Sequence, residues 1–107
     1  MTTIRFFRSG GRLTGFACRG HSGFAEAGED IVCAAVTSAV RLAECTIDDV
    51  LMAGADVSVD EAGACITVTL PRNCPNADGC RAVLEGLLLY LKELSIENPE
   101  HISVLEV

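Results

Sequence analysis

The order in which two hydrophobic periodicities follow each other along the chain restricts its fold more than any other feature. Apolar and polar residues alternate over Thr3–Arg8 and Arg12–Arg19, on either side of Ser9-Gly10-Gly11. Such alternation around a glycine pair is typical of a β-hairpin. Further on, apolar residues recur at spacings of three or four from Ile31 to Met52, which predicts an amphipathic helix.

The same succession then occurs a second time. Alternating segments at Ala55–Asp60 and Cys65–Leu70 predict another hairpin, and Asn76–Leu94 has the apolar spacing of a second helix. Ile102–Val107 predicts a final strand. The sequences of the two hairpin–helix units do not match, so the succession is not evidence of a repeat.

These elements predict an α+β fold of order ββαββαβ, in which two helices pack on a mixed sheet. The chain has 107 residues, a length that fits one domain with one core, and we expect residues 1–107 to form it. A chain of this size buries roughly two-thirds of its unfolded surface, so it needs neither a metal nor a disulfide to fold.

The second helix is apolar nearly all round over Leu87–Leu91, and the first is similar over Ile31–Val36. One apolar stripe is enough for a helix that lies on one sheet. The excess predicts a second buried face, which a symmetric homodimer would supply. The alternative is a monomer that buries both helices more deeply.

Charge and cysteine content exclude several classes of protein. The net charge is −7, whereas a protein that binds duplex nucleic acid usually has a basic face, so we expect no direct nucleic-acid partner. The residues after Met1 show neither a secretory signal nor an apolar run long enough to cross a membrane. We therefore expect a cytoplasmic protein whose six cysteines are reduced.

No metal or other cofactor is expected. Structural zinc sites usually contain cysteines separated by two residues, and the closest pair here, Cys74 and Cys80, is too widely spaced. This pair is either redox-sensitive or consists of one surface thiol and one packed thiol. The remaining thiols outside the segment discussed next fall on apolar faces and are expected in the core: Cys18, Cys45 and Cys65.

The segment from Gly20 to Cys33 contains the residues best suited to chemistry. His21 stands at the end of a predicted strand, a glycine-rich loop follows, and Cys33 falls in the first turn of the predicted helix. A helix N-terminus favours an anion by roughly 0.3–1 kcal/mol. A nearby imidazole would have to supply the rest of a thiolate's activation. The first-turn N–H groups could also hold an oxyanion.

Two roles are open for Asp30. As N-cap its carboxylate would accept the N–H of Cys33, or it could reach His21 and orient the ring. The loop is longer than most connections in compact domains. It is either an ordinary excursion or a flap that closes over an extended peptide, in which case the substrate-binding residues are Ser22, Gly23, Phe24 and Gly28.

From the residues alone, two functions are open. One is a cysteine peptidase in which Cys33 is the nucleophile and His21 its base. The other is a non-enzymatic dimeric module associated with the ribosome, in which Cys33 is an inert core residue. The acidic charge and the excess apolar helix surface motivate the second.

The segment resembles the ribosomal-processing cysteine protease family called Prp. The resemblance lies in Gly20-His21, Gly28 and the run Asp30-Ile31-Val32-Cys33-Ala34-Ala35-Val36. It implies a cytoplasmic homodimer that removes a short N-terminal extension from large-subunit ribosomal protein twenty-seven, cutting beside two phenylalanines. It also implies that Cys33 is the nucleophile, His21 the base and Asp30 the supporting acid. Thr37 stands where the family often has serine, a change that keeps the hydroxyl.

Two further groups of polar residues have no assigned role. The arginines of the first hairpin either lie on a solvated face or steer a ribosomal surface or a substrate carboxylate: Arg5, Arg8, Arg12 and Arg19. The segment from Asn73 to Asn76, between the second hairpin and the second helix, is a candidate pocket wall.

Overall fold

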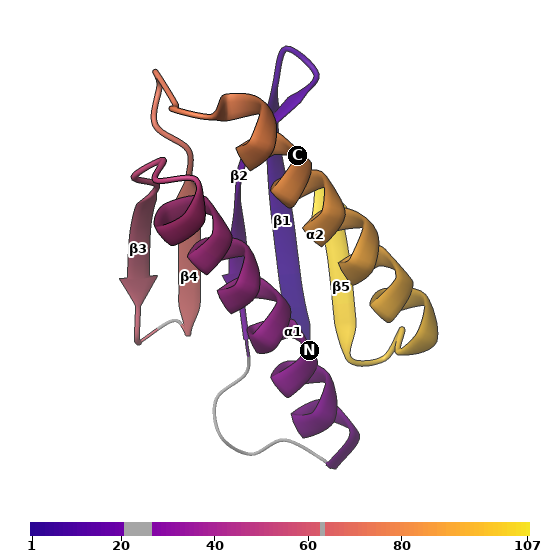
Figure 1. Ribbon diagram of the computed structural model, residues 1–107. Helices are drawn as coiled ribbons and strands as arrows, with labels where there is room; N and C mark the ends of the chain where they lie inside the picture. The colour runs from indigo at the N-terminus through magenta and orange to yellow at the C-terminus, as the bar shows by residue number, and fades with distance from the viewer. Residues whose placement is uncertain (21–26, 63) are drawn as a thin grey trace.

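A computed structural model of the chain (Figure 1) describes residues 1–20, 27–62 and 64–107, and only the backbone of residues 27–30. The elements are β1 (Thr2–Ser9), β2 (Arg12–Arg19), α1 (Ala27–Cys45), the π-helical segment η1 (Thr46–Val50), β3 (Asp56–Asp60), β4 (Cys65–Thr69), α2 (Ala77–Glu97) and β5 (Ile102–Glu106). This order confirms the predicted α+β class and the succession ββαββαβ.

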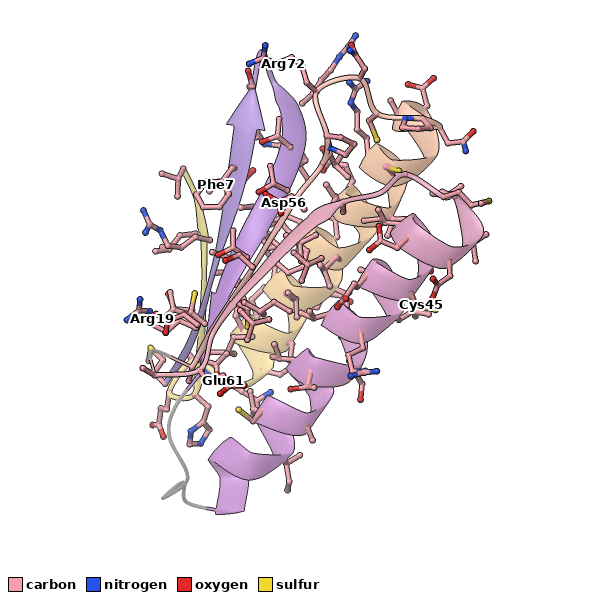
Figure 2. The ribbon with its side chains drawn as sticks, turned by 90° about the vertical axis from the view of Figure 1, so that its left-hand side faces the viewer. Phe7, Arg19, Cys45, Asp56, Glu61 and Arg72 are labelled. Carbon is pink, nitrogen blue, oxygen red and sulfur yellow. The ribbon has the colours of Figure 1, made fainter. Side chains whose placement is uncertain are left out.

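The strands form one mixed sheet in the order β3-β4-β2-β1-β5. Neighbouring strands are antiparallel except β1 and β5, which are parallel. Both long helices cover the same face of this sheet, and Phe7 and Arg19 point away from them on the other side (Figure 2). Within the described part of the chain, no helix has the length and apolar character needed to cross a membrane.

The predicted start of the first helix was wrong. α1 begins at Ala27 rather than after Asp30, so Asp30 is an internal residue of the first turn and not the N-cap. Ala27 and Glu29 are residue types with a good helix propensity, so the helix can begin one turn earlier. Consequently Cys33 lies in the second turn, beyond the four N–H groups that lack a partner within the helix.

The far end of this helix also differs from the prediction, which continued to Met52. α1 ends at Cys45 and η1 follows. A π-helical turn holds more residues than an α-helical turn, so it rotates the residues after it off the original stripe. Ile47 is still buried, but Val50, which was expected inside, is 70% exposed.

The core lies between the sheet and the two helices. Phe6 and Phe16 are opposite each other on β1 and β2, with ring centroids 5.7 Å apart. The helices supply the other layer of buried apolar side chains, mainly from Val32, Val36, Val40, Ala43, Ile47, Leu84, Leu87, Leu88 and Leu91. Each fully buried aliphatic side chain of this kind contributes about 1.5–3 kcal/mol.

A β-bulge in the first hairpin brings two large residues of β2 to the core. Arg8 pairs with Leu13 while Phe7 pairs with Gly15, so Thr14 is the extra residue. Its hydroxyl donates to the Phe7 carbonyl (3.3 Å), and its own carbonyl accepts the N–H of Leu70 (2.8 Å). Because the bulge shifts the alternation by one residue, Leu13 and Phe16 are both buried although they are three positions apart.

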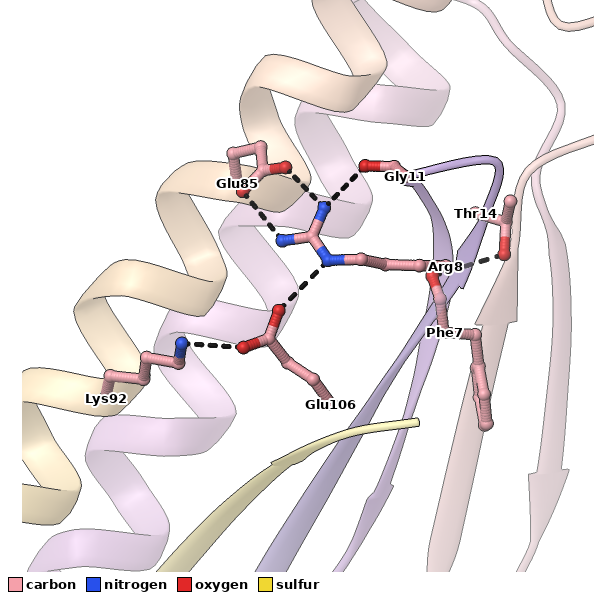
Figure 3. Close-up of polar contacts among 7 residues, drawn as sticks. All are labelled: Phe7, Arg8, Gly11, Thr14, Glu85, Lys92 and Glu106. Atoms are coloured by element: carbon pink, nitrogen blue, oxygen red, sulfur yellow. Dashed lines mark hydrogen bonds and ion pairs between the residues drawn. The ribbon is translucent and has the colours of Figure 1, made fainter.

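Arg8 fastens the turn of this hairpin to α2 and β5 (Figure 3). Its guanidinium donates to both carboxylate oxygens of Glu85, to Glu106 and to the Gly11 carbonyl. Lys92 donates to the other oxygen of Glu106 at 2.8 Å. Arg8 is thus not part of a merely solvated face.

We expect this network to make stability depend on pH in the acid range. Hydrogen bonds from Lys92 and then Arg8 hold the pKa of Glu106 below its ordinary value of 4.5. A lowered pKa means that the stabilisation is complete above that ordinary value and is lost as pH falls through the folded-state pKa. Glu106→Gln should therefore lower the melting temperature by a few degrees at pH 7, and by progressively less as the pH falls below about 4.5.

Thermal melts over pH 3 to 7 would check this expectation, with roughly constant ionic strength throughout. Glu93→Gln is the matched control, because Glu93 is an exposed α2 carboxylate with no ion pair among the described residues. Equal loss of stability at pH 3 and pH 7 for Glu106→Gln would contradict the ionic origin.

Candidate active site

A pocket of about 240 Å³ opens at the end of the sheet where β1 begins and β2 ends. Figure 2 shows Glu61 at this end and Arg72 at the opposite one. The walls are mainly apolar and come from β1, β2, α1 and the β3–β4 hairpin: Thr2, Cys18, Gly20, Cys33, Val36, Thr37, Val59, Asp60, Glu61, Ala64, Cys65 and Ile66. The pocket thus combines an apolar floor with two carboxylates at its edge.

Cys33 reaches this pocket from the inner side of α1. Its side chain is half-buried, and its Sγ lies 3.5 Å from the hydroxyl oxygen of Thr2. Thr2 is only 1% exposed, and its backbone N–H donates to the His101 carbonyl at 2.9 Å. The first residue of the sheet is thereby held in place, and it fixes the position of the thiol.

The end of β2 is tied to the same pocket. The N–H of Gly20 donates to the Ala64 carbonyl in the β3–β4 turn at 2.9 Å. Gly20 lines the pocket together with Cys33, and His21 is the next residue in the sequence.

The structure describes only some of the predicted site residues. Cys33 lies in the pocket, whereas the predictions for His21, Ser22, Gly23 and Phe24 fall outside the described residues. Gly28 and Asp30 belong to the first turn of α1 by their backbone.

Two other thiols line the pocket, Cys18 and Cys65. Burial, and then the neighbouring Cys33 and Cys65, raise the pKa of Cys18 to about 11. Cys18 is therefore a neutral thiol at physiological pH, packed beside Cys33. Cys18 and Cys65 are each half-buried rather than fully in the core.

The prediction that Cys45 is a core residue was wrong. It is exposed on the side of α1 away from the sheet (Figure 2), because it is two residues from the buried Ala43 and from the buried Ile47 and so points to the opposite side. Its thiol donates to an Asp49 carboxylate oxygen at 3.4 Å, and this hydrogen bond raises its pKa.

The pair Cys74 and Cys80 consists of one half-buried and one fully buried thiol. Both thiols donate to the Pro75 carbonyl, at 3.4 and 3.8 Å. Burial, followed by the hydrogen bond with Cys74, raises the pKa of Cys80 to about 11. This matches the expectation of one packed thiol.

Sequence reasoning missed the contribution of Thr2 and of the β3–β4 hairpin to the pocket. Strand alternation places Thr2 on the same face as Ile4 and Phe6, so its burial could have been predicted. The approach of Val59, Asp60 and Glu61 to Cys33 could not, since it depends on how the second hairpin pairs with the first.

Comparison with known proteins identifies the family. The model of the family described as cysteine protease Prp matches residues 1–103. The chain belongs to this family. It is accordingly a cysteine protease, and the alternative of a non-enzymatic module is set aside. No curated protein matches the chain.

Solved structures share the fold of this Prp family member over its whole length. A Streptococcus mutans protein superposes with a TM-score of 0.90 at 25% identity, covering 100% of this chain and 94% of its own. The essential ribosomal processing protease Prp from S. aureus, in complex with a substrate peptide, gives 0.88 at 22%, with 100% of both chains covered. Its complex with a covalently linked product peptide gives 0.85 at 23%, again with full coverage of both.

We expect Thr2→Val to slow proteolysis without unfolding the protein. Valine has nearly the shape of threonine but lacks the hydroxyl next to Sγ of Cys33. One hydrogen bond of this kind is worth about 0.5–1.5 kcal/mol, which corresponds to a roughly 2- to 10-fold lower kcat. Steady-state peptide cleavage would check it, with Thr2→Ser as the control that keeps the hydroxyl. A Thr2→Ser variant as slow as Thr2→Val would show that packing matters and the hydroxyl does not.

Proposed function

We propose that this protease removes a short N-terminal extension from large-subunit ribosomal protein twenty-seven, cutting beside a pair of phenylalanines. The observation that supports this most is the half-buried Cys33 thiol, which opens on an apolar pocket beside Gly20, the neighbour of His21. Membership of the Prp family and the shared fold with a ribosomal processing protease that binds a substrate peptide agree with it.

In this proposal Cys33 and His21 form a catalytic dyad. The imidazole of His21 takes the thiol proton, and the thiolate of Cys33 attacks the carbonyl carbon of the scissile peptide bond. The C–N bond breaks, the imidazolium returns its proton to the leaving amine, and a thioester remains on Cys33. Water, deprotonated by His21, then attacks the thioester, which releases the carboxylate product and regenerates the thiol.

The structure changes how the oxyanion would be stabilised. Because α1 begins at Ala27, its free N–H groups precede Cys33 by about one turn. We infer that the oxyanion is held by donors outside the turn of Cys33. Asp30, no longer a helix cap, is proposed as the group that orients His21.

The proposed substrate-binding residues are Ser22, Gly23, Phe24 and Gly28. The pocket's apolar walls, to which Val36, Val59 and Ile66 contribute, suit an aromatic side chain. Asp60 and Glu61 at its edge would favour a basic segment over an acidic one.

The test uses a synthetic peptide that spans the N-terminus of the host's own ribosomal protein, analysed by mass spectrometry. We expect one cut beside the phenylalanine pair, and kcat/KM about a hundredfold lower when both phenylalanines are alanine, because each apolar contact is worth roughly 1–3 kcal/mol. His21→Ala should lose cleavage, while His101→Ala, the other histidine of the chain, should keep it.

The possible outcomes test the proposed substrate and the proposed dyad separately. Cleavage of unrelated peptides but not of the extension would refute the substrate and leave the dyad standing. Full activity of His21→Ala would refute the dyad.

We further propose that the protein is a homodimer that joins through the outer faces of its two helices. A groove of about 320 Å³ runs between α1 and α2, lined by Ala39, Leu42, Ala43, Thr46, Val83, Gly86, Leu87 and Tyr90. Leu42 is 70% exposed and Tyr90 46% exposed. In the two stretches that are apolar nearly all round, Ile31, Leu89 and Tyr90 stay exposed. Part of the excess apolar surface is therefore not buried within one chain.

Leu42→Glu should convert the dimer to a monomer. A carboxylate in an apolar interface has to be desolvated, and we expect the dimer dissociation constant to rise about a hundredfold or more. Ile96→Glu is the matched control, because Ile96 is 79% exposed on α2 outside this groove. Light scattering across a dilution series would measure both, and equal dissociation in the two variants would exclude this groove.

We propose a cytoplasmic location for this protease. The six cysteines are unpaired in the structure, which is the state that a reducing compartment maintains.

A further inference from the structure

A second and larger cavity, of about 610 Å³, lies at the end of the sheet opposite Cys33. The β1–β2 turn and the segment that leads into α2 form its walls, and Figure 2 shows Arg72 at this end of the molecule. Its polar lining includes Arg12, Thr14, Arg72, Asn73 and Arg81. Asn73 and Cys74 from the candidate wall, and Arg12 from the hairpin arginines, therefore belong to one site.

The charge of this cavity is opposite to that of the protein. The chain has eight Lys and Arg against fifteen Asp and Glu. Yet Arg12, Arg72 and Arg81 line this one cavity, and among the described residues no carboxylate does. Three like charges around one hollow repel one another and focus a positive potential into it. An anion is the ligand that relieves this repulsion.

These arginines are not used to hold the fold together. Among the described residues, Arg12 and Arg72 form no ion pair, and Arg81 has only a 3.7 Å contact with the fully exposed Asp78. Arg8 is the contrast: it is saturated by Glu85, Glu106 and Gly11.

The contact of Arg8 with the Gly11 carbonyl (3.0 Å) fastens the turn. The bulged residue Thr14 is fixed by its bond to Leu70 at 2.8 Å. The wall that carries Arg12 is thus held in place on both sides before any ligand arrives.

The beginning of α2 lies at the same wall. Ala77, the first residue of this helix, lines the cavity. Asn76 precedes it in a left-handed conformation (φ 54) and does not cap the helix with its side chain. That side chain instead donates to the Leu51 carbonyl at 2.7 Å, so the first N–H groups of α2 are left for another acceptor.

We propose that this cavity binds a small phosphorylated molecule through its phosphate groups. The three guanidinium groups come from the hairpin turn, the inter-element loop and α2. Guanidinium groups carried by three different elements can bind the three terminal oxygens of a tetrahedral phosphate, whereas one guanidinium fork is enough for a planar carboxylate. The cavity volume lies within the roughly 300–1,000 Å³ range of small-molecule sites. A concave site on an otherwise acidic protein suits a small ligand better than a nucleic-acid strand, which needs an extended basic surface.

Inorganic pyrophosphate is the probe for this site. We expect isothermal titration calorimetry at low salt and without divalent metal to show saturable binding to the full-length protein. Arg12→Gln, Arg72→Gln and Arg81→Gln should each weaken binding about tenfold, the effect of removing one charged hydrogen bond. Arg5→Gln should change it less than about twofold, because Arg5 is equally charged and exposed but does not line the cavity.

Three further measurements distinguish a phosphate site from the catalytic pocket, from a carboxylate site and from an RNA site. Cys33→Ala should bind pyrophosphate as the wild type does, and citrate should bind more weakly than pyrophosphate. Equal weakening by Arg5→Gln, or no saturable binding, would overturn the proposal. If citrate bound more tightly than pyrophosphate, the site would be one for carboxylates rather than phosphates. If a short single-stranded RNA bound and pyrophosphate did not, the ligand would be RNA rather than a small molecule.

Discussion

Cys33→Ala should abolish peptide cleavage, with a fall in kcat/KM of about 10⁴-fold or more, because the attacking atom itself is removed. Cys33 is half-buried, and alanine fits the same helical position, so the variant should stay folded. Circular dichroism and the melting temperature would establish that the loss is chemical. Cleavage of the ribosomal extension peptide, followed by mass spectrometry over long incubations, gives the residual rate.

The other cysteines supply the controls. Cys45→Ala removes an exposed thiol that is bonded to Asp49, and it should leave the rate unchanged. Cys18→Ala removes the neutral thiol next to Cys33, and we expect a small effect through packing only. If Cys33→Ala cleaved at more than about a tenth of the wild-type rate, or if Cys18→Ala were the inactive variant, Cys33 could not be the nucleophile.

Gly15→Ala should be the most destabilising small substitution in the sheet. A Cβ at this position would lie 2.2 Å from the Val68 carbonyl oxygen and 3.0 Å from the Cα of Thr69. Both atoms belong to the backbone of β4, which pairs with β2 at this point, so the strands would have to separate. We expect a loss of about 3 kcal/mol or more in the free energy of unfolding.

Urea denaturation would measure this loss, with Gly86→Ala as the matched control. A Cβ at Gly86 meets nothing within 4 Å, and alanine is favoured over glycine in a helix by about 1 kcal/mol. Because Gly86 lines the proposed dimer groove, both variants should be compared at several protein concentrations. A Gly15→Ala protein as stable as the wild type would contradict the close pairing of β2 and β4.

The close pairing of β2 with β4 at Gly15 also affects the pocket of Cys33. The tight contact of β2 with β4 brings the β3–β4 turn to the end of β2, where Ala64 accepts the N–H of Gly20. Asp60 and Glu61 thereby reach the edge of the pocket. Loosening this pairing should weaken substrate binding as well as stability.

Most of the fold could be predicted because strand and helix periodicities are local. Period-two alternation located the strands of β1, β2, β3, β4 and β5 to within a residue or two, and α2 was expected from Asn76 and found from Ala77. The start of α1 was misjudged because Asp30 is a good N-cap residue, whereas Ala27 and Glu29 extend the helix by one turn at little cost. Side-chain preference alone could not decide between the two starts.

The candidate site was predictable only in part. Cys33 could be predicted as the nucleophile from its segment and from a family resemblance. The family match confirms that the chain is a cysteine protease. Thr2 could have been identified from alternation, but its contact with Cys33 joins residues far apart in the sequence. The pocket walls from Val59 to Glu61 depend on which strand β4 pairs with, and nothing local encodes that choice.

The arginines of the first hairpin show the difference between what the local sequence predicts and what tertiary packing decides. The sequence by itself determined that the chain forms two hairpins and two helices and that the segment from Gly20 to Cys33 carries the candidate chemistry, since these follow from local periodicity and residue type. It treated Arg8 and Arg12 as equivalent. Only the tertiary structure assigned Arg8 to the carboxylates of α2 and β5 and left Arg12 at a cavity, because the bulge at Thr14 and the packing of α2 on the sheet decide which groups meet.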